Sequence, residues 1–234
     1  CTKQEEFIDN FIVNKYHQII LETITVGQFR KFDDKLKDHF LSELFKNVNK
    51  NGEEFINNAK LILDYFDESY NNIEIIQVFK ITNDRNILVE IKYPCNKFEQ
   101  IMKIISDQKM KIFIQYPMTD NLYRTNFLNS SEMISYINEC SEIIFDIQYP
   151  SDNFEELYGK IAKFKDINKT KIKISIFINM EKTDQKFHGN KIIDIVRIDS
   201  NVKEIKSNGL SGSFEQCSSL TQIAIPTSVT SIGN

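Results

Sequence analysis

The chain has 234 residues, of which 41 % are apolar and 26 % charged, and its formal net charge is −4. This composition is ordinary for a globular protein, and the absence of a strongly basic segment argues against nucleic-acid binding. Apolar runs stay well short of the ~18 residues that a membrane-spanning helix needs, so we expect no transmembrane segment.

The N-terminal part of the chain, residues 1–71, carries apolar side chains at helical spacing. We expect helices over Glu5–Ile24, Val26–Val48 and Glu53–Glu68. Asn49-Lys50-Asn51-Gly52 ends the second, because Asn and Gly tolerate the left-handed conformation that closes a helix. The apolar stripes predict a bundle core, with a groove for a partner as the alternative use. Residues 1–71 are therefore interpreted as an N-terminal helical cap.

Residues 72–189 change to a strand–helix pattern. Ile73–Ile81 and Ile87–Tyr93 are rich in β-branched residues and predict two strands joined by a turn. Helices and strands then alternate, which favours parallel strands with helical crossovers. The expected helices are Lys97–Ser106, Ser131–Asn138 and Asn153–Lys163, and the strands that follow them are Met110–Tyr116, Ile143–Tyr149 and Lys171–Ile178.

All four prolines follow a predicted strand, where the missing N–H ends the ladder. Three of them, Pro94, Pro117 and Pro150, close the pattern Ile-x-Tyr-Pro at unequal spacings. We interpret this as degenerate repetition of a strand–helix unit, with coincidence in an Ile- and Tyr-rich region as the alternative.

The C-terminal segment repeats more clearly. Residues 198–205 align with residues 225–232 at an offset of 27, and each copy follows a short apolar strand, Val196–Ile198 or Ile223–Ile225. Units this small cannot bury their own apolar residues, so stacked coils must share a core. The expected core residues are Ile198, Val202, Ile205, Phe214, Cys217, Leu220, Ile223, Ile225, Val229 and Ile232.

Phe214, Cys217-Ser218-Ser219-Leu220, Ile225-Pro226, Ser228-Val229-Thr230 and Ser231-Ile232-Gly233-Asn234 together resemble the BspA-like leucine-rich repeat family. The resemblance covers about the last fifth of the chain. Asp199 stands where the family has proline, and the spacer after the first copy is longer, so residues 195–207 resemble an entry repeat. The pattern stops in mid-repeat at Asn234, and we expect the natural protein to continue.

The fold class expected is thus α/β. Residues 1–71 form the helical cap, residues 72–189 the strand–helix repeats with parallel strands, and residues 190–234 the start of a leucine-rich-repeat solenoid truncated at its C-terminus. The resemblance implies a non-enzymatic scaffold for protein interaction or adhesion. The outward positions expected to contact a protein partner are Arg197, Lys203, Thr221, Gln222 and Ala224.

Motifs of enzyme chemistry are missing from the sequence. Neither a dinucleotide-binding glycine motif nor a phosphate-binding loop occurs. The cysteines Cys1, Cys95, Cys140 and Cys217 and the histidines His17, His39 and His188 lack metal-ligand spacing. We therefore predict no catalytic residue, cofactor or metal.

Two alternatives stay open. One is an intracellular adaptor whose helical region recruits a second partner. The other is an enzyme with its site at the carboxyl ends of the strands, near Tyr93, Tyr116 and Tyr149. The sequence leaves both cell surface and cytoplasm open as the location, and it does not identify the partner or the oligomeric state.

Overall fold

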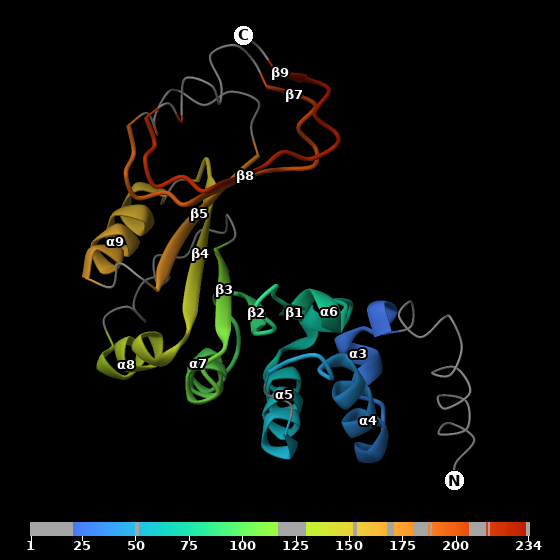
Figure 1. The fold of residues 1–234 in the computed structure, drawn as a ribbon. Helices are drawn as coiled ribbons and strands as arrows, with labels where there is room; N and C mark the ends of the chain where they lie inside the picture. Colours follow the sequence, from blue (N-terminus) through green and yellow to red (C-terminus); the bar gives the residue numbers. More distant parts are fainter. Residues whose placement is uncertain are drawn as a thin grey trace. The chain divides into compact units, whose positions relative to one another are not determined.

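The structure is a computed structural model that describes residues 21–49, 52–116, 130–151, 154–167, 171–179, 187, 189–205, 214 and 216–232. It divides into two compact units, Cys1–Ile91 with Cys95–Ile112, and Lys92–Pro94 with Phe113–Asn234. Figure 1 shows the elements of both. Most of the expected helix Glu5–Ile24 lies outside the described residues.

The first unit contains the helices α3 (Val26–Phe29), α4 (Asp34–Leu44) and α5 (Glu53–Tyr65), and the short 3-10 helix η1 (Glu68–Tyr70). The prediction of one helix over Val26–Val48 is therefore wrong in its continuity. Two separate caps explain the break: Thr25 caps α3, and the Asp33 carboxylate accepts a hydrogen bond of 2.9 Å from the Leu36 amide at the start of α4.

The expected strand Ile73–Ile81 is the second correction. Its middle forms the helix α6 (Ile75–Val78), and only its end forms the strand β1 (Phe79–Ile81). The amide of Ile75 donates to the carbonyl of Ile24 at 2.9 Å, so tertiary contacts replace the strand ladder that β-branched residues favour. β1 pairs antiparallel with β2 (Ile87–Lys92), and the helix α7 (Phe98–Asp107) follows.

The second unit is built on parallel strands. The strands β3 (Lys111–Tyr116), β4 (Glu142–Tyr149), β5 (Ile172–Ile178), β6 (Ile195–Ile198) and β8 (Gln222–Ala224) complete the sheet order β1-β2-β3-β4-β5-β6-β8. The pair β4–β5 is parallel, as the alternating pattern predicts, and the pairs β5–β6 and β6–β8 are parallel as well. The helices are α8 (Ser131–Glu139) and α9 (Phe154–Ile167), and β7 (Glu204–Ile205) pairs separately with β9 (Ser231–Ile232).

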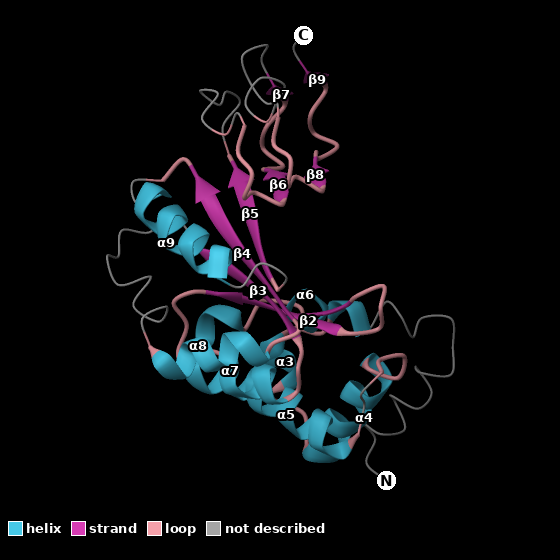
Figure 2. Cartoon of the chain, turned by 60° about the vertical axis from the view of Figure 1, so that its left-hand side comes forward, coloured by secondary structure: helices cyan, strands magenta, loops and turns pink. Residues whose placement is uncertain are grey.

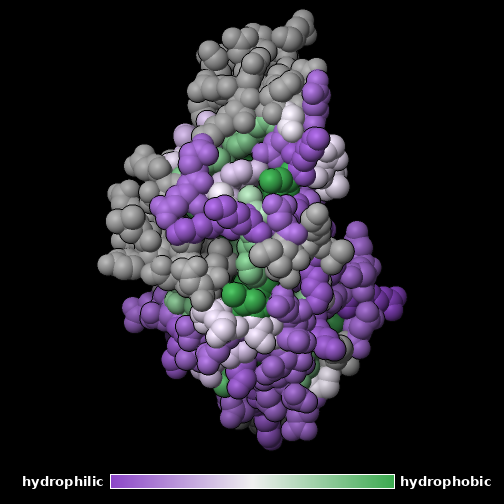
Figure 3. All heavy atoms as spheres, turned by 90° about the vertical axis from the view of Figure 1, so that its left-hand side faces the viewer, coloured by the Kyte–Doolittle hydropathy of each residue, from purple (hydrophilic) through white to green (hydrophobic). Residues whose placement is uncertain are grey.

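α9 covers one face of this sheet. Phe154, at the start of α9, packs edge-to-face on Tyr149 of β4 with ring centroids 5.0 Å apart. Side chains alternate along a strand, so Ile147 shares that face and Asp146 points to the other. Figure 2 shows α9 lying along β4 and β5. On the side drawn in Figure 3, hydrophilic side chains cover most of the described surface, as expected where helices meet solvent.

An apolar row crosses from the strand–helix part into the C-terminal coils. The register places Ile147 beside Ile176, Ile176 beside Val196, and Val196 beside Ile223. The first three side chains are buried. The core of the α/β region therefore continues directly into the segment that carries the sequence repeat.

Candidate protein-binding face

The two copies of the C-terminal repeat, residues 195–205 and 222–232, are called here the first and the second coil, and they pair through two sets of parallel strands. In the first strand pair, Ile195 lies beside Gln222 and Arg197 beside Ala224. In the second pair, Glu204 lies beside Ser231. The partners in both pairs are separated by the offset of the sequence repeat. That offset is thus also the register in which the two coils pair, and Figure 2 shows the described parts of these coils as short strands joined by loops.

Threonine hydroxyls reinforce this stacking. Thr221 directs both its amide and its hydroxyl to the carbonyl of Asp194, at 2.8 and 3.0 Å. Thr230 does the same to the carbonyl of Lys203, at 2.8 and 3.3 Å. Donor and acceptor are again separated by the repeat offset. The second coil is therefore fixed on the first by side-chain as well as backbone hydrogen bonds.

Burial differs sharply between equivalent positions of the two coils. Val196 is 0 % and Ile198 7 % exposed, whereas Ile223 and Ile225 are 45 % and 46 % exposed. The expectation that Ile223 and Ile225 lie in a closed core is therefore not met in this chain. The reason is that β6 lies between β5 and β8, while β8 pairs with β6 alone among the described strands.

Other expected core residues pack as stacking requires. Val202 and Ile198 form one buried cluster, and Val229 of the second coil packs against it. Phe214 is buried and stacks on Phe187 with ring centroids 5.3 Å apart. The first coil thus gains its core partly from the second.

Cys217 is half-buried and donates from its sulfur to the carbonyl of Phe187 at 2.9 Å. Burial raises the pKa of this thiol, which favours its neutral form. Leu220 is half-buried as well. The side chains of Ile205 and Ile232 lie outside the described residues.

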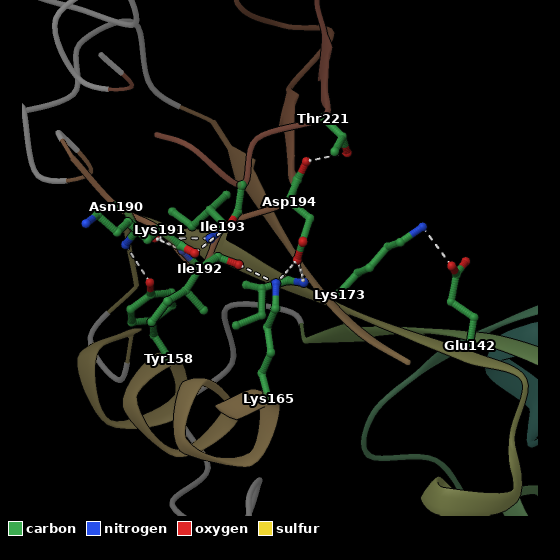
Figure 4. Close-up of polar contacts among 12 residues, drawn as sticks. Glu142, Tyr158, Lys165, Lys173, Asn190, Lys191, Ile192, Ile193, Asp194 and Thr221 are labelled. Atoms are coloured by element: carbon green, nitrogen blue, oxygen red, sulfur yellow. Dashed lines mark hydrogen bonds and ion pairs between the residues drawn. The ribbon is translucent and has the colours of Figure 1, made fainter. Parts of the chain in front are cut away.

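Asp194 joins three elements at the start of β6, and sequence reasoning did not single it out. Its carboxylate accepts from the Lys165 ammonium of α9 and from the Ile174 amide of β5, the latter at 2.7 Å. Lys165 also donates to the Ile192 carbonyl at 2.6 Å. Figure 4 shows Lys165 directed at Asp194 and Ile192, with Thr221 at the backbone carbonyl of Asp194. α9, β5 and both coils are therefore held at one point.

The residues just before Asp194 are fixed in the same way. The Asn190 side-chain nitrogen donates to the Tyr158 hydroxyl at 2.5 Å (Figure 4). The side-chain oxygen of Asn190 accepts from the backbone amides of Ile192 and Ile193 at 2.8 and 3.0 Å. Burial raises the pKa of Tyr158, so its hydroxyl stays neutral. This loop has a structural role at the entry to the coils.

The predicted contact residues divide into two groups. Arg197 and Ala224 are register partners on β6 and β8, and the alternation along β8 places Gln222 on the same face. Thr221 precedes β8 and Lys203 lies between β6 and β7, so these two stand apart from that row. Gln222, Ala224, Thr221 and Lys203 are all exposed, and Arg197 is half-buried.

Asp146 and Ser175 share the face of Arg197, and the sequence analysis missed both. The Ser175 hydroxyl donates to one oxygen of the Asp146 carboxylate at 2.5 Å, and an Arg197 terminal nitrogen donates to the other at 2.9 Å. Asp146 is only 5 % exposed. A charged residue inside the apolar run Ile143–Ile147 was the signal that could have marked it.

No protein-family profile, curated protein or solved structure significantly matches the chain. Within the described ranges, no helix combines the length and apolarity needed to cross a bilayer.

Near the strand ends, the Tyr149 ring packs on the rings of Phe154 and Phe187, each with centroids 5.0 Å apart, while the Tyr116 side chain lies outside the described residues. Tyr149 is thus a core residue.

Proposed function

We propose that this protein is a non-enzymatic scaffold that binds another protein through the face of β5, β6 and β8 opposite α9. One observation carries the proposal: the two C-terminal coils pair at the offset of the sequence repeat in both of their strand pairs. Stacked coils of this kind present a continuous surface built from equivalent positions, which suits recognition of an extended partner. The resemblance to BspA-like leucine-rich repeats supports the same function.

The chemistry of the face also supports binding. Gln222 and Ala224 are exposed on β8, and Arg197 lies beside Ala224 on β6. The backbone beneath them is fixed by the strand pairing and by the double hydrogen bond of Thr221. Side chains on rigid strands lose little conformational freedom when they bind, so more of their interaction energy contributes to affinity.

Site-specific photo-crosslinking tests this function. A benzoylphenylalanine introduced at Gln222 in the full chain should give a discrete covalent product in extract of the cells that make the protein. The matched control is the same residue at Lys163, which is exposed on α9 and thus belongs to the opposite side of the sheet. Excess unlabelled protein should suppress the product from position 222. Identical products from both positions, or none from position 222, would reject the proposed face.

A further inference from the structure

The guanidinium group of Arg197 lies against two aromatic rings. Its central carbon is 5.2 Å from the centroid of the Phe113 ring and 5.3 Å from that of Phe177. Phe177 is its register neighbour on β5, and Phe113 belongs to β3. Arginine is favoured at such places because its planar cation interacts with ring faces while its edge stays available for hydrogen bonds.

The hydrogen-bond donors of Arg197 are only partly used. An arginine side chain has five N–H donors. Among the described residues, Arg197 makes one hydrogen bond, from its terminal nitrogen to Asp146. The Arg197 side chain as a whole is 35 % exposed. Asp146, held in turn by Ser175, fixes one terminal nitrogen of the group, and the remaining N–H donors have no other acceptor among the described residues.

We propose that Arg197 is the anchor of this face for a carboxylate, the side chain of an Asp or Glu on the bound protein. The proposal rests on the protein-binding function for its biological role. A carboxylate matches the arginine edge because its two oxygens can accept two parallel N–H bonds. The two rings and Asp146 restrict the guanidinium before the ligand arrives, which lowers the entropy lost on binding.

The charge of Asp146 offsets part of the attraction that Arg197 offers to an anion. Its carboxylate lies 2.9 Å from the same guanidinium, so any incoming anion meets one positive and one negative charge. Repulsion from Asp146 grows in proportion to the charge of the ligand. Attraction to Arg197 grows in the same proportion, so the pair weakens the binding of a carboxylate and of a phosphate by the same fraction, and inorganic phosphate is therefore the competing probe.

Nuclear magnetic resonance of the arginine side chains tests this inference directly. The sequence contains four arginines, Arg30, Arg85, Arg124 and Arg197, so the Nε–Hε spectrum holds few signals. An Arg197→Lys variant assigns the signal of interest by its loss. The probe is N-acetyl-glutamate N-methylamide, and its neutral counterpart is the corresponding glutamine derivative. The Arg197 signal should shift saturably with the glutamate probe, with a Kd on the order of 10 mM for one carboxylate.

An internal control comes from Arg30, whose Nε donates to the Leu63 carbonyl at 3.2 Å and whose signal should not move. A Phe177→Leu variant keeps the charge pair but removes one ring, and it should weaken binding about two- to fivefold. The carboxylate assignment is overturned if the glutamine probe shifts Arg197 equally, if no saturation occurs, or if inorganic phosphate binds more tightly. These outcomes come from the unmutated protein, so they do not depend on how the Phe177 variant folds.

The two proposals fail separately. If crosslinking from position 222 succeeds and the glutamate titration fails, the binding face stands and the carboxylate anchor is wrong. If the titration succeeds and crosslinking gives no specific product, Arg197 binds carboxylates but the protein-binding face is wrong.

Discussion

Ile198 and Ile225 occupy the same position in the two stacked coils, so alanine substitutions at each measure what stacking contributes. The change removes three methyl or methylene groups, worth about 2.4 kcal/mol if fully buried. Ile198 is 7 % exposed, so Ile198→Ala loses nearly all of this burial energy and also leaves a cavity. We expect the free energy of unfolding to fall by about 2–4 kcal/mol. Ile225 is 46 % exposed, so Ile225→Ala loses only about half of this burial energy. Its free energy of unfolding should fall by about 1 kcal/mol.

Two measurements check this difference. Urea unfolding followed by circular dichroism gives the free energy of unfolding of each variant. Hydrogen exchange of the Val196 and Ile198 amides reports the local opening of β6, which a global transition could hide in a chain of two compact units. Equal destabilisation by Ile198→Ala and Ile225→Ala would refute the reasoning, because it would show that stacking of the second coil on the first does not determine burial.

Three further predictions follow from single contacts. Lys165→Met removes two hydrogen bonds and leaves the largely buried Asp194 carboxylate without its counter-charge. The free energy of unfolding should therefore fall by about 2–3 kcal/mol in the same urea assay. A fall of less than about 0.5 kcal/mol would contradict this prediction. Gly27→Ala would place a Cβ 2.9 Å from a backbone carbonyl oxygen and should cost about 1–3 kcal/mol, whereas Gly159→Ala, with open space around the added atom, should not destabilise. Burial raises the pKa of the Cys140 thiol to about 12, so iodoacetamide at pH 8 should label it far more slowly in the native than in the urea-unfolded protein, as read by peptide mass spectrometry; equal rates would count against the buried placement.

Strand–helix alternation was predictable because its signals are local. The expected strand Ile143–Tyr149 and the observed β4 differ by one residue at the start, and the expected helix Ser131–Asn138 ends one residue before α8 does. Ile73–Ile81 could not be predicted in this way. Its β-branched residues suit a strand, but hydrogen bonds between residues 24–27 and 71–75 decide its conformation, and those depend on contacts distant in sequence.

The candidate face was predictable only where the chain is periodic. The repeat offset aligns the two C-terminal strands in the sequence, and Arg197 and Ala224, which are separated by that offset, are register partners in the structure. Asp146 and Ser175 could not be added, because the registers of β4 with β5 and of β5 with β6 follow no common period. Asp146 pairs with Ser175, and Ser175 pairs with Ile195 at a clearly shorter separation along the chain. A charge cluster across unequal spacings needs the coordinates.

β5 and α9 together cover the start of the first coil. A first coil exposes its apolar positions unless another element covers them, and a polar cap normally does so. Here β5 supplies the covering strand, since Ile176 and Ile178 pair with Val196 and Ile198. Lys165 of α9 then fixes the entry point through Asp194. The last strand–helix unit thus covers the apolar positions of the first coil, while Phe177 on the other face of β5 lies against Arg197 and the buried Ser175 holds Asp146.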